Sequence, residues 1–413
     1  MTNYEELKWR GLIKDEAGNV EELINKGGFS FYWGTDPTAD SLHIGHYSSL
    51  ITAKRLAKMG NHPILLVGGA TGLIGDPRPT AEREIIEIDT VLNNVNKIKE
   101  QVSNIFDGNC EIVNNYDWMK DISLIDFLRD TGKYINVNYM LDKDIIKRRL
   151  ETGITFAEFT YTLMQGYDFL HLYREKNCVL QAEGSDQWGN ITTGIDLIKK
   201  IEGKDAYAFT MPLILDDSGK KFGKSEGNAI WLDKNKTSSY EMYQFLINSS
   251  DTKVEEYLKV YTFLTPDEIM KIMKKHLEKP EEHLAQKELA KAIITDLHGE
   301  EEYKHALELS EALFIGDISK LKADDVLTVF KGMPISHVNN DSKIVDLLVD
   351  NKIVSSKREA REFITNGAIS INGLKVTDLE FIVKKEDAID SKYTIIRRGK
   401  KKYYVVVFGD NNE

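Results

Sequence analysis

The chain has 413 residues, 41% of them hydrophobic and 29% charged, with a formal net charge of −12. This length predicts two or three domains, and the composition is that of a soluble globular protein, without an apolar run near the about 20 residues that cross a bilayer. The polar residues 1–6 lack the pattern of a secretory signal, and the two cysteines, Cys110 and Cys178, form no C-x-x-C pair. We therefore expect a cytoplasmic protein without a membrane segment, a disulfide framework or a cysteine metal site.

Strands and helices alternate in the first half of the chain. Apolar and aromatic runs predict strands at 29–35, 62–68 and 178–182, and amphipathic patterns predict helices at 45–59 and 188–200. A strand, a helix and a strand in about 40 residues form a βαβ unit of a parallel sheet. The mainly helical stretch of about 83–174 predicts an insertion within this Rossmann-like α/β fold.

The second half changes character. Residues 238–331 predict helices, with Pro266 and Pro280 near helix starts. Two short helices and a β-rich segment follow a stretch rich in Gly, Pro and Asn. The predicted parts are a catalytic domain at 1–225, a helical domain at 226–331, a linker at 332–341 and a small α+β domain at 342–409.

The first polar cluster lies between the strand at 29–35 and the helix after it. His43 and His46 are three residues apart and share one face at the start of that helix. The free N–H groups and the dipole of a helix start favour a phosphate, and Gly45 leaves room for a flat ring against the backbone. Two ordinary surface histidines beside a turn are the alternative.

A second cluster, Lys220 to Ser225, follows an apolar segment at 212–215 that predicts a strand. Lysines such as Lys221 and Lys224 on a mobile loop balance the charge of a triphosphate. A solvated basic loop is the alternative for this cluster alone.

A third cluster lies in the helical insertion. Tyr161, Gln165 and Asp168 are spaced i, i+4 and i+7, so they line one face of a helix. That face is polar within an apolar segment, which indicates a polar ligand. A Tyr–Asp pair that satisfies itself in a core is the alternative.

Together these clusters resemble a known family. The first two are similar to the two ATP motifs of class I aminoacyl-tRNA synthetases, H-I-G-H and a K-M-S-K-S variant. The chain has neither a G-x-x-x-x-G-K-[ST] loop nor a G-x-G-x-x-G fingerprint. With the third cluster, the segment ending at Asp76 and the segment 184–190, nearly the whole chain resembles the bacterial-type tyrosyl-tRNA synthetases.

The resemblance implies roles for residues in two sites. For tyrosine, it implies that Asp76, Tyr161 and Gln165 contact the ammonium group. Tyr32 and Asp168 would contact the phenol, and Gln187 would contact the carboxylate. For ATP, it implies phosphate contacts from Thr38, His43, Lys221 and Lys224, a ribose contact from Asp186, and a nucleotide site completed by Gly45, His46 and Ser225. Trp33 and Thr35 depart from the family pattern beside the ribose.

The implied activity is that of a tyrosine–tRNA ligase. L-tyrosine and ATP form tyrosyl-adenylate and diphosphate, and the tyrosyl group then passes to the 3′ end of tRNA(Tyr). Mg²⁺ is expected with ATP, held by phosphate and water, so no dedicated metal site is predicted. The resemblance also implies a homodimer.

The tail resembles an RNA-binding module of the ribosomal-protein S-four type. Residues 341–413 carry 14 Lys and Arg against 12 Asp and Glu, on an otherwise acidic chain. Lys357, Arg358 and Arg361 are expected to contact RNA phosphate, and a solvated charged helix is the alternative. A tryptophanyl enzyme and a non-catalytic RNA-binding relative are the other functions that we considered.

Overall fold

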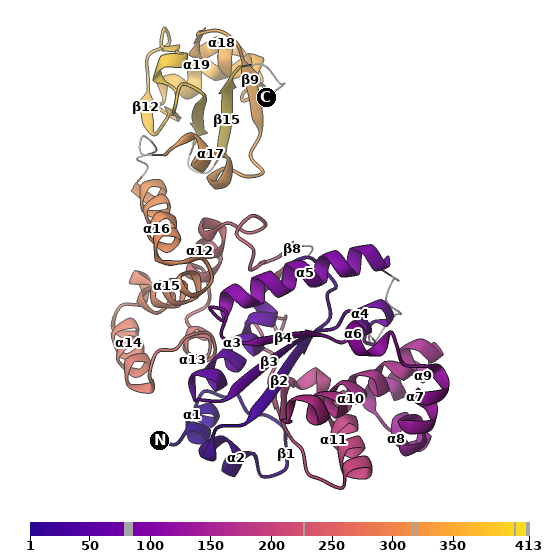
Figure 1. Ribbon diagram of the computed structural model, residues 1–413. Coiled ribbons are helices and arrows are strands. Elements are labelled where there is room, and N and C mark those ends of the chain that lie inside the picture. Colours follow the sequence, from indigo (N-terminus) through magenta and orange to yellow (C-terminus); the bar gives the residue numbers. More distant parts are fainter. Residues whose placement is uncertain (78–85, 226–227, 316–317, 319–320, 400–401, 410–413) are drawn as a thin grey trace. The chain divides into compact units, whose positions relative to one another are not determined.

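The computed structural model has two compact units (Figure 1). The first unit is residues 1–237 with 247–297, and the second is residues 238–246 with 298–413. The structure describes residues 1–77, 86–225, 228–315, 318, 321–399 and 402–409. No helix in these described ranges is long and apolar enough to cross a membrane.

A six-stranded sheet forms the centre of the first unit, in the order β1-β6-β5-β2-β3-β4. All neighbouring strands are parallel except β1 and β6. This confirms the parallel sheet predicted from the sequence. The strands are β1 (Glu16–Ala17), β2 (Ser30–Thr35), β3 (His62–Val67), β4 (Glu111–Asn114), β5 (Cys178–Gly184) and β6 (Tyr207–Met211).

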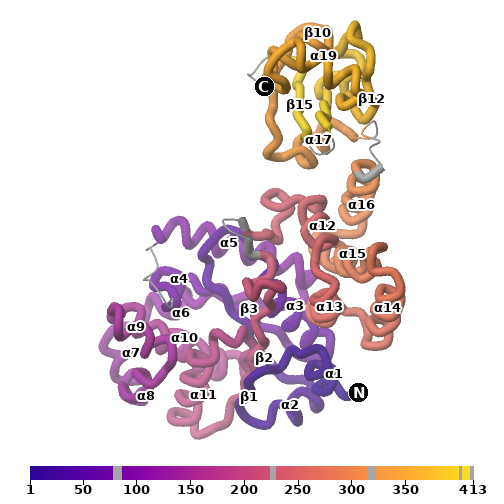
Figure 2. Tube along the Cα trace, turned by 180° about the vertical axis from the view of Figure 1, so that it is seen from behind, coloured from indigo at the N-terminus to yellow at the C-terminus, as the bar shows by residue number. Residues whose placement is uncertain are grey.

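Helices of the first unit lie on both faces of this sheet, and α13, α14 and α15 extend to one side of it (Figures 1 and 2). They are α1 (Asn3–Trp9), α2 (Val20–Lys26), α3 (Ile44–Lys58), α4 (Thr71–Ile74), α5 (Ile88–Ile105), α6 (Tyr116–Met119), α7 (Leu124–Asp130), α8 (Val137–Leu141), α9 (Asp144–Leu150), α10 (Phe156–Lys176), α11 (Trp188–Glu202), α13 (Val254–Tyr261), α14 (Pro266–Glu278) and α15 (Leu284–His298). Side chains alternate along β2, so Tyr32 packs on Phe169 of α10, while Trp33 bonds Ser49 of α3. Helices α3 and α10 therefore cover opposite faces of β2.

One strand prediction in this unit was wrong. The strand expected at 212–215 lies earlier, as β6, which ends at Met211. Pro212 has no N–H for the ladder, so the strand stops before it. The short edge strand β4 was missed.

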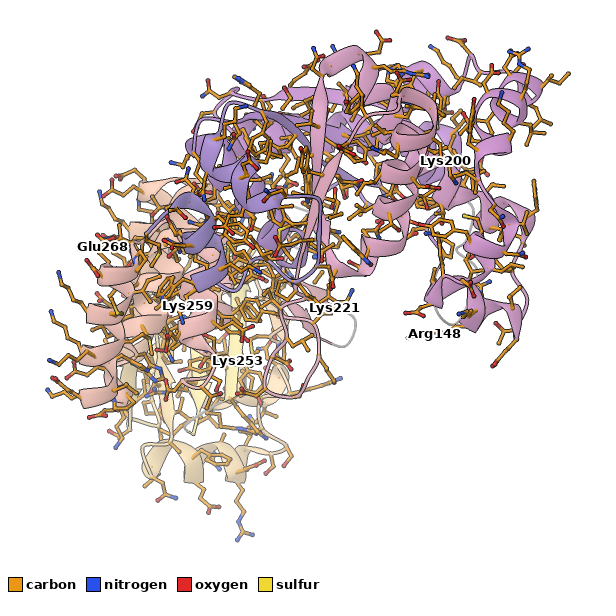
Figure 3. The ribbon with its side chains drawn as sticks, turned by 90° about the horizontal axis from the view of Figure 1, so that it is seen from below. Arg148, Lys200, Lys221, Lys253, Lys259 and Glu268 are labelled. Atoms are coloured by element: carbon orange, nitrogen blue, oxygen red, sulfur yellow. The ribbon has the colours of Figure 1, made fainter. Side chains whose placement is uncertain are left out.

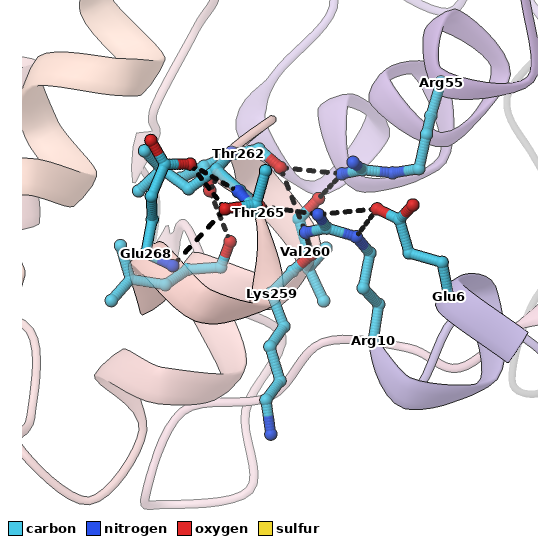
Figure 4. A network of polar contacts seen from close by, with 10 residues as sticks. Glu6, Arg10, Arg55, Lys259, Val260, Thr262, Thr265 and Glu268 are labelled. Atoms are coloured by element: carbon cyan, nitrogen blue, oxygen red, sulfur yellow. Dashed lines mark hydrogen bonds and ion pairs between the residues drawn. The ribbon is translucent and has the colours of Figure 1, made fainter. Parts of the chain in front are cut away.

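Helix α13 is attached to α1 and α3 by two buried arginines (Figure 4). Arg10 donates to the Lys259 and Thr262 carbonyls at 2.9 and 3.3 Å, and Arg55 donates to the Thr262 carbonyl at 2.8 Å. Arg10 and Arg55 are 2% and 4% exposed. Cations at a helix C-terminus satisfy its free carbonyls and its negative dipole end, so α13 is fixed at that end.

The second unit contains a five-stranded sheet in the order β12-β11-β14-β15-β9. Its helices are α12 (Ser239–Ile247), α16 (Glu300–Ile315), α17 (Ala323–Val329), α18 (Ile344–Asp350) and α19 (Lys357–Thr365). Its strands are β9 (Ile335–Val338), β10 (Ser342–Lys343), β11 (Ile369–Ile371), β12 (Leu374–Val376), β13 (Ile382–Val383), β14 (Tyr393–Arg398) and β15 (Lys402–Phe408).

The prediction of a linker at 332–341 was wrong. This segment contains β9, which pairs in parallel with β15 from Ile335 to Val338. The Gly, Pro and Asn residues that suggested a linker flank this edge strand as turns. The helices expected as one domain at 226–331 are also divided, because α13, α14 and α15 belong to the first unit and the others to the second.

Candidate active site

A hydrogen-bonded chain of side chains crosses the carboxyl ends of β2, β3 and β4. Asp36, directly after β2, accepts from the Tyr161 hydroxyl at 2.8 Å and from the Thr71 hydroxyl at 2.7 Å. The Asn115 amide donates to the Thr71 oxygen at 2.9 Å. Carboxyl ends of parallel strands are where ligands bind in such sheets, so this chain forms one wall of a candidate site.

This series of hydrogen bonds ends at a buried carboxyl group. Asp168 is 1% exposed and accepts from Asn115 at 2.9 Å and from the indole N–H of Trp118 at 2.9 Å. Burial raises the pKa of Asp168 from 3.8 to about 8, against the opposing effect of these two donors. Burial and the charge of Asp168 also raise the pKa of Tyr32.

Three buried polar atoms around this wall have no hydrogen bond of normal geometry to any residue that the structure describes. They are the Tyr32 hydroxyl, the Gln165 Oε1 and the Gln181 Nε2. Tyr32 and Gln181 are register partners on β2 and β5, so their side chains leave the same face of the sheet. Buried polar groups without partners cost about 1–3 kcal/mol each, which fits a site that receives a polar ligand.

Asp76 lies in a second polar wall of the candidate site. It accepts from the Gln187 amide at 3.0 Å and from the Asn190 amide at 3.2 Å. Asn190 also accepts from Thr162 at 2.8 Å, which connects this wall to α10. The structure therefore brings Asp76, Gln187 and the α10 cluster together, although they are far apart in the sequence.

The histidine cluster begins helix α3. His43 is its N-cap, and the His43 Nδ1 accepts from the Gly45 N–H at 3.1 Å. The His43 and His46 rings are stacked, with centroids 3.8 Å apart. A Cβ on Gly45 would lie 2.9 Å from the His43 ring, so glycine allows this ring to fold over the start of the helix.

The lysine loop, Lys220 to Ser225, packs against this same helix start, and backbone hydrogen bonds connect the two. Ile44 N–H donates to the Ile230 carbonyl at 2.8 Å, and Ile230 N–H donates to the Gly223 carbonyl at 3.1 Å. Gly223 has φ of +78°, and a Cβ there would lie 1.9 Å from Ile44. The two predicted ATP motifs are therefore in direct contact.

The basic and hydroxyl groups of these motifs differ in placement. Lys221 and Thr38 are exposed, and Figure 3 shows Lys221 at the surface of the first unit. Lys224 and Ser225 form the short strand β7 (Lys224–Ser225), which pairs with β8 (Asn228–Ala229). In the described ranges, no group of three or more His, Cys, Asp or Glu side chains could hold a metal ion.

Two further carboxyl groups lie at the end of β5. Asp186, predicted to contact ribose, is exposed, and a Cβ on Gly184 would lie 2.7 Å from its Oδ1. Glu183 is 5% exposed and accepts from the Gly34 N–H of β2. Burial raises the pKa of Glu183 well above its ordinary value. Strands β2 and β5 pair as far as Tyr32 and Gln181. The Glu183 side chain thus connects the two strands beyond this last pair.

Trp33, which departs from the family pattern, is 2% exposed. Its indole N–H donates to the Ser49 hydroxyl at 2.9 Å, and Ser49 donates to the His46 carbonyl at 3.0 Å. The side chain therefore packs between β2 and the first turns of α3, next to the histidine cluster.

The predicted RNA-contacting residues are all exposed on α19 of the second unit. Lys357 forms an ion pair with Asp346 at 2.7 Å. Ala360 and Ile364 on the other face of α19 are buried in the core of this unit. Lys357, Arg358 and Arg361 thus lie on an outward face.

Sequence reasoning missed several members of the site. Asp36 and Thr71 lay within segments that we had noted, but no role was assigned to either. Asn115 and Trp118 follow the unpredicted strand β4, so nothing in the local pattern marked them. Position after a predicted strand was the available signal for Asp36 and Thr71 only.

Comparison with known proteins identifies the family of this chain. The family model "tRNA synthetases class I (W and Y)" matches residues 25–315, and "Tyrosine--tRNA ligase SYY-like C-terminal domain" matches residues 325–406. A "Tyrosine--tRNA ligase" of Streptococcus pyogenes serotype M49 (strain NZ131) is 50% identical, covering 99% of this chain and 100% of the relative. The chain belongs to the tyrosine–tRNA ligase family.

Solved structures of this family have the same fold. A C-terminally truncated mitochondrial tyrosyl-tRNA synthetase of Aspergillus nidulans is 32% identical with a TM-score of 0.69, over 76% of this chain and 94% of that one. The corresponding protein of Coccidioides posadasii is 31% identical with a TM-score of 0.67, over 75% and 91%. The family assignment confirms the resemblance found in the sequence, and it removes the tryptophanyl alternative.

Proposed function

We propose that the chain activates L-tyrosine with ATP and transfers the tyrosyl group to the 3′ end of tRNA(Tyr). The observation that carries the amino-acid assignment is the Asp168 carboxyl group, held by Asn115 and Trp118 beside the Tyr32 hydroxyl. A phenol gives both groups a partner in the buried site. Phenylalanine leaves the Tyr32 hydroxyl buried without a partner, at a cost of about 1–3 kcal/mol, and gives the Asp168 carboxyl group no donor beyond Asn115 and Trp118.

Recognition of the amino-acid ammonium is assigned to the second wall. Asp76 is a carboxylate acceptor, and Tyr161 and Gln165 lie on the α10 face that connects to it. Gln165 contributes an oxygen with no partner among the described residues. Gln187, hydrogen-bonded to Asp76, is placed to donate to the substrate carboxylate near the reacting phosphate.

The first step is attack of the tyrosine carboxylate oxygen on the α-phosphorus of ATP. The bond from the α-phosphorus to the bridging oxygen breaks, and diphosphate leaves with that oxygen. The start of α3 offers the positive end of its dipole to the phosphates and the lysine loop offers cations, and the direct contact of these two motifs supports this role. We assign phosphate contacts to Thr38, His43, Lys221 and Lys224.

The nucleoside part of ATP is assigned to the ends of β2 and β5. Asp186 is the proposed acceptor for the ribose hydroxyls, with Gly45, His46 and Ser225 completing the site. Mg²⁺ is proposed to arrive with ATP, coordinated by phosphate and water. The second step needs no protein nucleophile, since the terminal tRNA hydroxyl attacks the activated carbonyl and AMP leaves.

Partners and location are also proposed. The C-terminal unit binds tRNA through Lys357, Arg358 and Arg361, whose exposure on one helix suits phosphate contact. The protein acts in the cytoplasm as a homodimer. Four large apolar side chains of the insertion are 49–74% exposed and support an interface with a second copy: Leu124, Ile125, Leu128 and Phe156.

ATP–diphosphate exchange with each amino acid in turn tests this function. We expect exchange driven by tyrosine, with phenylalanine and tryptophan far behind. Exchange with tryptophan alone would contradict the pocket assignment. Exchange with no amino acid would favour the remaining alternative, a non-catalytic RNA-binding relative.

A further inference from the structure

Phe222 anchors the lysine loop. It lies between Lys221 and Gly223 and is 4% exposed, whereas Lys221 is exposed. The Phe222 ring centroid is 4.1 Å from that of Tyr257 and 5.6 Å from that of Tyr261, both on α13. The loop therefore inserts an aromatic ring into the protein directly beside a basic side chain.

The two tyrosines of α13 also reach the backbone of both ATP motifs. The Tyr257 hydroxyl donates to the Leu215 carbonyl at 3.1 Å, at the base of the lysine loop. The Tyr261 hydroxyl lies 3.5 Å from the carbonyl of Ile44, the first residue of α3. The Tyr261 ring is also parallel to the ring of Tyr47 on α3, with centroids 6.1 Å apart. One helix thus contacts the histidine cluster and the lysine loop together.

Helix α13 is suited to hold a fixed position. Its C-terminal carbonyls are bonded by the buried Arg10 and Arg55 (Figure 4). Tyr257 and Tyr261 are each 1% exposed, so their rings cannot move without disturbing the packing around them.

We propose that Tyr257 and Tyr261 are positioning residues for tyrosyl-adenylate formation. Through Phe222 they set the resting place of the lysine loop, and through Ile44 they set the start of α3. The backbone of the loop is thereby held in one position relative to His43. This inference rests on the proposed function.

Steady-state ATP–diphosphate exchange separates this role from general packing. Phe222→Leu keeps an apolar side chain but removes the ring, and we expect kcat to fall about 10- to 100-fold because the lysines are misplaced. Tyr257→Phe removes one oxygen and is expected to lower kcat about fivefold. The KM for tyrosine is expected to stay within about twofold in both. Tyr243→Phe, at a buried tyrosine of α12 in the second unit, is the matched control and leaves both kcat and the tyrosine KM unchanged.

Trypsin cleavage of the native chain at Lys221 tests the anchor without catalysis. We expect Phe222→Leu to raise the cleavage rate about tenfold, because the loop opens more often, while Tyr243→Phe does not. Unchanged cleavage, or a kcat within about twofold of the parent chain, overturns the inference. A rise in the tyrosine KM that equals the fall in kcat also overturns it. If the parent chain shows no tyrosine-driven exchange, the proposed function fails, and the cleavage rates alone decide whether Phe222 anchors the loop.

Discussion

The indole nitrogen of Trp118 lies 2.9 Å from Oδ1 of Asp168, and the two residues come from different helices, α6 and α10. The Trp118 ring also stacks on His171, with centroids 4.3 Å apart. These contacts hold the Asp168 carboxyl group in one orientation within the apolar surroundings of α10. The selectivity that we propose for a phenol therefore depends on a residue that no local sequence pattern marked.

Asp168→Ala is expected to abolish most of the preference for tyrosine over phenylalanine. Without the carboxyl group, the phenol loses its acceptor, while phenylalanine, which has no hydroxyl, loses no hydrogen bond. Competition between the two amino acids in the exchange assay measures this preference, and we expect a loss of at least about 100-fold. Asp130→Ala, at an exposed aspartate of α7, is the control. An undiminished preference in Asp168→Ala would refute the pocket assignment.

The stability of the protein is expected to depend on pH through Asp168. Its folded-state pKa of about 8 lies above the ordinary 3.8, so the folded chain holds more proton than the unfolded chain between these values. The contribution to stability is full below about pH 4 and is lost as the pH rises through 8.

Asp168→Asn removes this titration. Between pH 5 and 8, the free energy of unfolding by urea should decline more steeply in the parent chain than in the variant, by at most about 1.4 kcal/mol per pH unit. Glu183 is present in both chains, so its effect cancels in the comparison. Parallel pH profiles would show that Asp168 is ionised in the folded protein.

His43→Ala is expected to lower the rate of adenylate formation by about 100-fold or more, because a phosphate contact made in the transition state is lost. Tyrosine affinity should change little, since His43 lies at the start of α3, and α10 covers the opposite face of β2. Pre-steady-state kinetics measure both quantities. His62→Ala, at an exposed histidine of β3, is the control, and equal kinetics in the two variants would remove the role given to His43.

Gly223→Ala is expected to displace the lysine loop. The added Cβ would overlap Ile44 and would strain a backbone with φ of +78°. Gly219→Ala is a matched control from the same loop, because its φ is +79° and nothing lies within 4 Å of the added atom. We expect kcat for exchange to fall at least about tenfold in Gly223→Ala only. Similar losses in both variants would attribute the effect to backbone strain.

The paired substitution Arg358→Ala with Arg361→Ala is expected to weaken tRNA binding. Loss of two phosphate contacts should raise the KM for tRNA about tenfold and reduce its salt dependence. Exchange, which needs no tRNA, should stay unchanged. Lys304→Ala on α16 is the control, and an unaltered tRNA KM in the paired variant would exclude these arginines from the RNA surface.

Local sequence patterns predicted the elements that carry a strong apolar period. The strands at 29–35 and 62–68 and the helix at 45–59 correspond to β2, β3 and α3, within one or two residues. Local patterns did not predict a strand that forms only through pairing with a strand distant in the sequence. Ile335 and Val338 form a strand only because β15 offers a partner, and the turn residues around them indicated a linker.

The site was predictable to the extent that its residues lie in recognisable motifs. Tyr161, Gln165 and Asp168 could be placed on one helix face from their spacing alone. Their partners could not, because Asn115 and Trp118 meet Asp168 across about 50 residues of intervening chain through the packing of β4 and α10. Contacts of that kind follow from the sheet order, which local periodicity does not specify.

The arginines that hold α13 also determine where the chain can be divided for expression. Residues 1–237 contain Arg10 and Arg55, but the carbonyls that satisfy their guanidinium groups come from 259–264. Burial, together with the charge of Arg10, lowers the pKa of Arg55 to about 9. A fragment that ends at 237 removes the backbone carbonyl acceptors of both guanidinium groups and leaves Arg10 with its ion pair to Glu6 alone. A recombinant fragment that retains the nucleotide site must therefore continue through α15.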